Sequence, residues 1–292
     1  MVAAVFLVLA GLISGCQHKN QLDGLTLTVA QHSSTDNMAY FDVRRMADVW
    51  ASGLPTSRPI LITTKDFTDN VTRLRAGAVD VALATADIAT EAAESKQPGQ
   101  RNLRALTWMH SYYVELTALE YSPARTLTDL LGRQVTVNVA NPELELLASR
   151  LLEAAGIDAE RKHLTMGDGM RALTTASIDA RFFGSTDPDG LFGQRPGGLR
   201  SLDLSGVLPA LRARYPAYTR AASSGSFVMV PVLLLVTDAM PDSVAEALTR
   251  TLLESRNLDN VMNQGNTRPG LARDTMPIPL HPGAQKYYRS IN

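Results

Sequence analysis

Short apolar runs of strand length alternate with segments of helical spacing along most of this 292-residue chain. A first set opens at Leu25–Val29, where apolar and polar residues alternate, and continues with a helical pattern over Met38–Trp50. A second set opens at Gln134–Val139, and a helix follows from Pro142. Because strands that alternate with helices form parallel sheets with right-handed crossovers, the sequence predicts an α/β fold.

Two such sets, each of roughly 100 residues, predict two Rossmann-like lobes. The segments Tyr112–Leu119 and Phe227–Thr237 are long enough to connect them as a two-strand hinge, with a cleft beside it. We therefore expect lobe one to contain residues 25–117 plus 237–292, and lobe two to contain residues 118–236. In open α/β sheets the loops after the strands collect at the ligand site, so a ligand is expected in the cleft.

Shorter signals predict the bounds of other elements. Thr68 is expected to cap a helix that ends at Gly77, since its oxygen can accept from free amides of the first turn. Leu103–Met109 and Tyr112–Leu119 are predicted as two strands, and Gly169–Ser177 as a helix.

The chain begins with an apolar run, Val2–Ile13, that is too short to cross roughly 30 Å of hydrocarbon as a helix. The sequence Ile13-Ser14-Gly15-Cys16 fits the lipobox of bacterial lipoproteins, in which the cysteine receives lipid. We interpret residues 1–24 as a lipoprotein signal sequence and tether, outside the fold. The alternative is a buried N-terminal strand with a chance cysteine.

Lipid on Cys16 would anchor the mature protein to a bacterial membrane on its periplasmic side. Cys16 is the sole cysteine, so no disulfide can hold the fold together. The formal net charge is −1, which gives no electrostatic footprint for nucleic acid. With 45% hydrophobic and 20% charged residues, the composition is that of an ordinary globular protein that depends on its own core.

The C-terminal segment is similar to the signature of a known family. Pro277-Ile-Pro-Leu-His-Pro-Gly-Ala-Gln-Lys-Tyr-Tyr-Arg289 resembles the C-terminal signature of TAXI proteins, the solute-binding subunits of TRAP-type transporters. Further strings follow the family order, and the resemblance covers roughly residues 25–289. These strings are Leu74-Arg-Ala-Gly-Ala-Val-Asp-Val81, Leu151-Leu-Glu-Ala-Ala-Gly156, Arg214-Tyr-Pro-Ala-Tyr218, Val230-Pro-Val-Leu-Leu-Leu-Val-Thr237 and Ala239-Met-Pro-Asp-Ser-Val244.

The resemblance implies a type II periplasmic-binding-protein fold. It also implies capture of a small anion-bearing metabolite, often an amino or organic acid. We expect no cofactor. The implied partner is a sodium-driven membrane permease of TRAP type.

Two ligand loops depart from the family pattern. The first loop, Gln31–Asn37, lacks the glycines that let backbone amides close on a carboxylate. A second loop, Val139-Ala-Asn-Pro-Glu143, is shorter than in the family and has gained Glu143. A carboxylate at a helix N-terminus competes with an anionic ligand for the same positive end.

Polar residues after the predicted strands of lobe one are candidate ligand-binding residues. In the first loop, hydroxyls and free amides could bind an anion, or they could cap the next helix. Asp87 could take an ammonium group, or it could cap its own helix. The lobe-one candidates are Gln31, Ser33, Ser34, Thr35, Tyr40, Thr85 and Asp87.

Lobe two contributes candidates after its strands and one within a strand. Asn138 and Asn141 flank a strand end, although capping is the more expected role of Asn141. Arg181 could pair with a carboxylate, or it could be an edge-strand residue that faces water. Ser185 and Thr186 could line the cleft, or they could belong to a plain turn.

Enzyme motifs are absent from the sequence. There is no Gly-x-Ser-x-Gly elbow, no His-Glu-x-x-His and no Walker loop. None of the five histidines has a partner at metal-binding spacing, and His281 is expected to make a structural hydrogen bond. We therefore expect neither an enzyme nor a metal site.

The sequence thus predicts a lipid-anchored solute-binding protein of the periplasm. It would capture a small anionic metabolite between its lobes for a TRAP-type permease, closing by hinge rotation. One alternative is a ligand-sensing or structural lipoprotein on the same fold. Another is an enzyme on the same scaffold.

Overall fold

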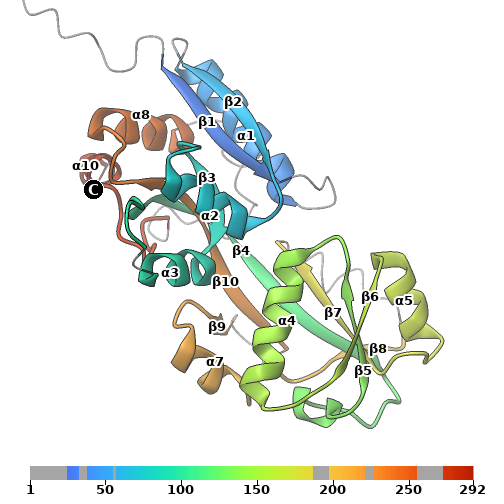
Figure 1. Ribbon diagram of the computed structural model, residues 1–292. Helices are drawn as coiled ribbons and strands as arrows, with labels where there is room; N and C mark the ends of the chain where they lie inside the picture. Colours follow the sequence, from blue (N-terminus) through green and yellow to red (C-terminus); the bar gives the residue numbers. More distant parts are fainter. Residues whose placement is uncertain are drawn as a thin grey trace, which may run out of the picture.

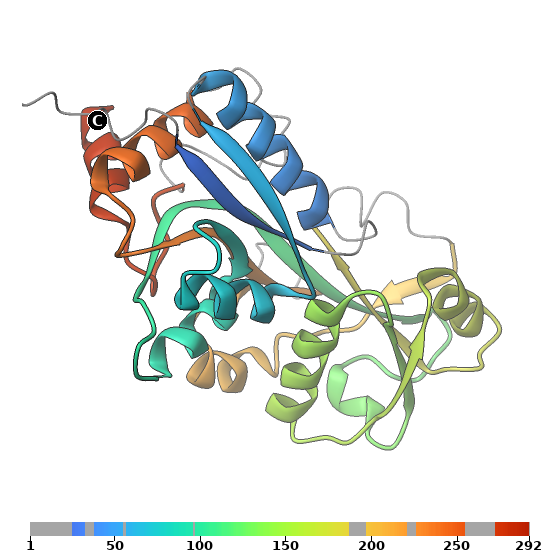
Figure 2. The same ribbon diagram turned by 45° about the horizontal axis from the view of Figure 1, so that its top comes forward.

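Two long strands form the frame of the molecule. β10 (Phe227–Thr237) pairs antiparallel with β4 (Leu103–Leu119) from Leu103 to Glu115, and Figures 1 and 2 show that the two strands join two separate groups of helices and strands. The prediction of two strands in place of β4 is wrong, because pairing with β10 continues through His110 and Tyr112. The connecting segments are therefore also structural strands of both lobes.

This computed structural model describes most of the chain after the predicted leader. The described residues are 25–32, 38–54, 57–95, 97–186, 197–220, 226–254 and 272–291, except the side chains of residues 32, 38–42, 219 and 220. The leader and Cys16 lie outside them. Within these residues, no helix combines the length and apolar character that crossing a membrane requires.

Lobe one is built on the half of β10 that carries Val232–Leu235, where β3 (Ala82–Thr85) pairs antiparallel. β1 (Thr26–His32) and β2 (Arg58–Thr64) form a parallel pair, and the Ala30 amide joins β1 to the Val81 carbonyl just before β3. The helices of this lobe are α1 (Met38–Gly53), α2 (Phe67–Ala76), α3 (Ala86–Glu94), α8 (Asp242–Leu253) and α10 (Pro282–Ser290).

Lobe two extends the sheet from the other half of β4. β7 (Ala180–Ser185) pairs antiparallel with β4, and β5 (Gln134–Asn138) lies parallel between β7 and β6 (Glu160–Leu164). Its remaining elements are η1 (Leu127–Leu130), α4 (Pro142–Ala155), α5 (Met166–Thr174), β8 (Leu199–Ser201), α7 (Leu208–Arg214) and β9 (Thr219–Arg220).

The expected parallel pairing holds within each lobe but not at the frame. β1 with β2, and β5 with β6 and β7, are parallel. β10 is antiparallel to β3, β4 and β9, and β4 is antiparallel to β7 and β8. The reason is the path of the chain, which enters lobe two through β4 and returns through β10 in the opposite direction.

Helix ends follow their expected signals with two corrections. Gly77 ends α2 in the left-handed conformation, as predicted, and Gly156 ends α4 in the same conformation. The cap of α2 is Asp66 rather than Thr68, because the Asp66 carboxylate accepts from the Asp69 amide at 2.7 Å. α5 begins three residues before the expected Gly169, since Thr165 caps it.

The C-terminal helix α10 packs tightly on α8. A Cβ on Gly283 would collide with the carbonyl oxygen of Asp242, so only glycine allows this approach. The expected structural role of His281 is confirmed: its Nδ1 accepts from the Gly283 amide at 3.1 Å, and its Nε2 donates to the Met240 carbonyl at 3.0 Å. The C-terminal signature therefore fixes the helix pair that flanks lobe one.

His281 should make stability depend on pH. Burial lowers the pKa of its imidazole, although the Met240 carbonyl and Asp242 favour the charged form. Below the ordinary histidine pKa of about 6.5, the unfolded chain therefore binds more protons than the folded one, and stability falls. Urea unfolding from about pH 7.5 to 5 should show a steeper loss for wild type than for H281N, whose Asn can cap α10 without titrating. Parallel pH profiles would contradict this assignment.

Candidate functional site

Helix α4 of lobe two lies against the N-termini of two helices of lobe one. Oε1 of Glu143, in the first turn of α4, accepts from the amide of Phe67, the first residue of α2, at 3.2 Å. Both the carboxylate and the amide are buried. A carboxylate does occupy the positive end of a helix, as the sequence suggested for Glu143, but the helix belongs to the opposite lobe.

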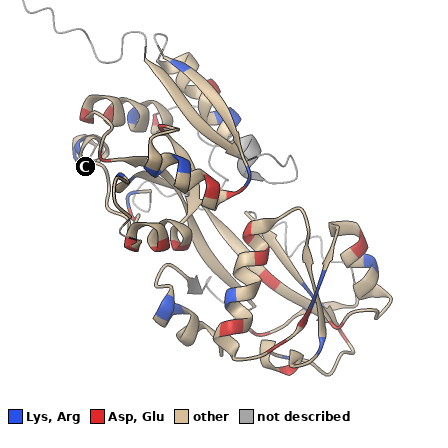
Figure 3. Cartoon of the chain, in the orientation of Figure 1, with Lys and Arg blue, Asp and Glu red and all other residues tan. Residues whose placement is uncertain are grey.

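A second contact between the lobes is a buried ion pair. The Arg150 guanidinium of α4 bonds to Oδ2 of Asp87 and to Oε2 of Glu91, both on α3. The side chains of Arg150 and Asp87 are 3% and 0% exposed, and the Tyr218 hydroxyl also donates to Asp87. Figure 3 shows acidic residues in red on α3 and a basic residue in blue on α4.

Arg150 keeps its charge in this buried place. Burial opposes ionisation, but Asp87, Tyr218 and Glu91 outweigh it and raise the pKa of the guanidinium. Arg150 also lies over the ring of Tyr215, with its guanidinium carbon 4.2 Å from the ring centre. Burial and Asp87 together raise the pKa of Tyr218, which stays a neutral donor.

Two buried oxygens at the end of β3 have no hydrogen-bond partner within the described part of the chain. They are Oγ1 of Thr85 and Oδ1 of Asp87. Thr85 is the residue before α3, yet its hydroxyl makes no cap bond. Because an unpaired buried polar atom costs free energy, these oxygens are candidates for bonds to a bound molecule.

A third group of residues lies where β4 passes into lobe two. Nδ2 of Asn141 donates to the hydroxyl of Tyr112 at 2.9 Å. The phenol sits so close to the backbone of Gly184, on β7, that a Cβ there would collide with it. Burial and the nearby Glu143 raise the pKa of Tyr112, so the hydroxyl stays protonated.

The structure places most described candidates at strand ends. Gln31 is buried at the end of β1, where its carbonyl accepts from the Thr64 hydroxyl at 3.0 Å. Asn138 ends β5, and its side chain accepts from the Ala140 amide. Ser185 ends β7, and Thr186 follows it and is buried. Thr85, Asp87 and Asn141 belong to the contacts described above.

Arg181 lies away from these strand ends. It pairs with Thr117 in the sheet register, four positions before Ser185 on β7. Its guanidinium carbon lies 4.7 Å from the ring centre of Phe183, and α5 covers this face through Gly169. Burial lowers the pKa of Arg181, although Glu115 opposes this effect.

Other residues fall outside what the structure describes or outside the prediction. Ser33, Ser34, Thr35 and the side chain of Tyr40 lie outside the described residues. Tyr112, Glu143, Arg150 and Tyr218 take part in the contacts but were not predicted as site residues. The sequence did contain a signal for Glu143, because this residue is an addition to the family pattern of a ligand loop. Arg150 had none, because a single arginine in an apolar helix does not reveal its partner.

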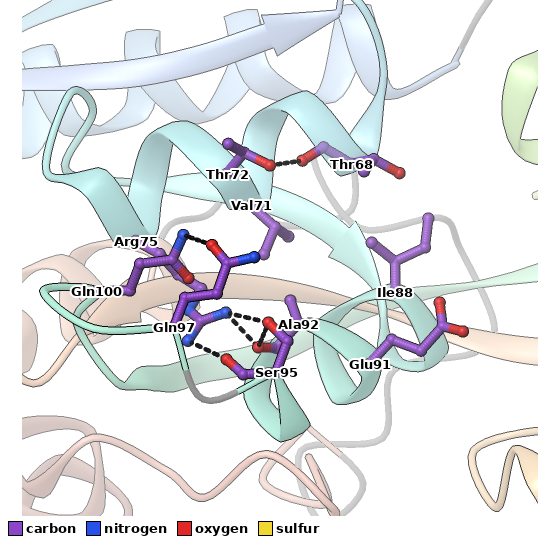
Figure 4. Close-up of a pocket in the computed structure, with 10 residues that line it drawn as sticks. All are labelled: Thr68, Val71, Thr72, Arg75, Ile88, Glu91, Ala92, Ser95, Gln97 and Gln100. Carbon is purple, nitrogen blue, oxygen red and sulfur yellow. Dashed lines mark hydrogen bonds between the residues drawn. The ribbon is translucent and has the colours of Figure 1, made fainter.

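A separate pocket of about 330 Å³ lies entirely within lobe one, between α2 and α3. Figure 4 shows Ile88 and Glu91 at one end of it and Gln97 and Gln100 at the other. The guanidinium of Arg75 is directed at Ala92 and Ser95, whose oxygens it bonds. Among the described residues, no cluster of His, Asp and Glu side chains is suited to a metal ion.

Comparison with known proteins gives a family model and a fold. A model of the NMT1-like family matches residues 34–193 and 225–291. The solved structure of XAC2383 from Xanthomonas citri bound to chloride is 14% identical, covering 91% of this chain and 99% of that chain with a TM-score of 0.59. The ATP-bound structure of XAC2383 is 16% identical over the same shares, with a TM-score of 0.54. The two-lobed α/β architecture is the fold that this chain shares with both structures of XAC2383.

We expect Asn141 to contribute to stability mainly by capping α4, and less by its hydrogen bond to Tyr112. Its Oδ1 accepts from the Leu144 amide at 2.9 Å in the first turn of α4. N141A should lower the free energy of unfolding by about 1 kcal/mol, whereas N141S keeps a capping oxygen and should lose only a few tenths. Urea unfolding measures both. Equal losses in the two variants would assign the effect to the bond with Tyr112 instead.

Proposed function

The chain belongs to the NMT1-like family, and we propose that it is an extracytoplasmic solute-binding protein that captures a small molecule between its two lobes. The observation that carries the proposal is the pair of buried oxygens on Thr85 and Asp87 without a partner among the described residues, since Asp87 also pairs with Arg150 of the other lobe. Two connecting strands support it, because they allow the lobes to rotate about one hinge.

We take lobe one as residues 25–117 plus 237–292 and lobe two as residues 118–236. The ligand would contact side chains of both lobes, so binding would favour the arrangement in which the lobes meet. Gln31 and Thr85 of lobe one, and Asn138, Ser185 and Thr186 of lobe two, are the described residues proposed to reach it. Arg181 is proposed as a deeper charge that attracts an acidic group.

The proposed ligand is a small metabolite with a carboxylate, such as an organic or amino acid. The α2 N-terminus already holds a carboxylate, that of Glu143. The similar protein XAC2383 is bound to chloride in one structure and to ATP in another, and both are anions. These observations support an anion site, and binding without turnover accounts for them.

The C-terminal signature and the lipobox support the finer parts of the proposal. Lipid on Cys16 would hold the protein at the periplasmic face of a bacterial membrane. A permease of TRAP type would receive the solute. A sensing lipoprotein on the same fold is a second candidate, favoured by the protein's own carboxylate at the α2 N-terminus.

The ligand can be sought by thermal shift on the C16S chain with a panel of organic and amino acids. A compound present at about 100 times its Kd adds about 2.7 kcal/mol, which raises the melting temperature by about 5 °C or more. T85V should lose this shift without losing stability, because the hydroxyl has no partner among the described residues. T90V is the matched control, since the Thr90 hydroxyl bonds within α3. A panel without any response, or an equal shift in T85V, would contradict the proposal.

The anchor is tested separately. Wild-type chain expressed in a bacterium should incorporate labelled palmitate and sediment with membranes, whereas C16S should do neither, because the thiol is the attachment point. A replacement at the neighbouring position, Q17A, is the control. Labelling of C16S, or absence of label from wild type, would refute the lipoprotein assignment.

A further inference from the structure

The two contacts that α4 makes with lobe one come from one face of the helix. Glu143 and Arg150 are seven residues apart, which is two turns, so their side chains point the same way about 10 Å apart along the axis. Glu143 meets the N-terminus of α2, and Arg150 meets the first turns of α3. The helix therefore spans two neighbouring helix ends of the other lobe.

Removal of either α4 side chain would take a hydrogen-bond or ion-pair partner from a buried polar group of lobe one. The Phe67 amide is one of the four free donors at the start of α2, and the Asp66 side chain is already used on Asp69. Asp87 is fully buried, and without Arg150 its carboxylate would keep the Tyr218 hydroxyl and would need water to replace the guanidinium. Separation of the lobes would admit that water.

A carboxylate is thus observed at a helix end that faces the other lobe. The Asn70 side chain of α2 donates to the Leu83 carbonyl, which brings α2 onto the end of β3, where the unpartnered Thr85 hydroxyl lies. The same edge of lobe one therefore offers a carboxylate position and a buried hydroxyl that bonds to nothing described. Together they suit a small molecule with a carboxylate and a second polar group.

We propose that α4 is a clasp that holds the two lobes together by protein contacts alone, and that the carboxylate of Glu143 fills the position that a solute carboxylate takes over. This inference rests on the proposed function, because it assigns a competitor to the same ligand site. Glu143 would keep the site shut to weak binders, and a solute would have to bind strongly enough to displace it. The ligand class follows: a small carboxylic acid with a further hydrogen-bonding group.

The chain allows a direct measurement of the clasp. Because Cys16 is the sole cysteine, the C16S chain can carry two spin labels at engineered cysteines, at Asp48 on α1 and Arg171 on α5, both exposed. With no solute added, E143A and R150M should shift the label distance distribution away from that of the labelled parent. E145A should not, because Glu145 pairs with Arg161 and His163 within lobe two.

Acetate tests the carboxylate position itself. Added to E143A, acetate should restore the parent distance and raise the melting temperature by about 2 °C or more, while equal chloride should not. Parent and E145A should show no such response. If R150M fails to fold, D87N/R150M removes the stranded charge and should still shift the distance.

Unchanged distances in E143A and R150M would overturn the clasp. Altered distances in E143A without a specific effect of acetate would overturn the assignment of Glu143 to a carboxylate position. The measurement uses no solute other than acetate. A failed ligand screen with a positive clasp result would therefore refute the proposed solute and leave the clasp standing.

Discussion

The antiparallel pairing of β4 with β10 is the constraint on which the rest of the structure depends. Each strand is long enough to serve both lobes, so hydrogen bonds run without a break from β3 through the hinge to β6. β10 is buried along nearly its whole length, which makes it the shared core of the molecule. A frame of this kind resists shear between the lobes but can twist, since β4 and β10 are the two strands of the described residues that cross from one lobe to the other.

The contact that α4 makes with lobe one, beside β4 and β10, is formed by charged side chains and not by apolar ones. Burying Arg150 and Asp87 costs desolvation free energy, which their mutual attraction, Glu91 and the Tyr218 hydroxyl offset. An apolar contact of the same size would hold the lobes more firmly, because exposing it to water is unfavourable. Charged groups can regain hydration when the lobes part, so an ion pair suits a contact that must form and break.

The sequence predicted the α/β class, most strands and several caps because these depend on local patterns. An asparagine followed by a proline, as at Asn141 and Pro142, favours the start of a helix, and a glycine such as Gly77 favours its end. β6 escaped prediction because Glu160–Leu164 is mostly polar at the edge of the sheet. The site was harder. Arg150 and Tyr218 meet Asp87 only because α3, α4 and the segment after α7 converge, and no spacing in the chain encodes that meeting. Arg181 was placed on the correct strand, but one residue type cannot reveal its distance from the strand end.

The sequence correctly predicted that the Glu143 carboxylate occupies a positive helix end, but the structure was needed to show which helix it is. The sequence places a carboxylate in the first turn of α4, where the positive helix end attracts it. Asn141 already bonds the Leu144 amide, so α4 has less need of a second acceptor. At the start of α2 an acceptor is still needed. The Asp66 carboxylate accepts from the Asp69 amide, so the Phe67 amide takes its acceptor from another helix. The Glu143 carboxylate therefore crosses to α2. The caps Asp66 and Asn141, one in each lobe, decide where the Glu143 carboxylate goes, and this division of hydrogen bonds ties the lobes together.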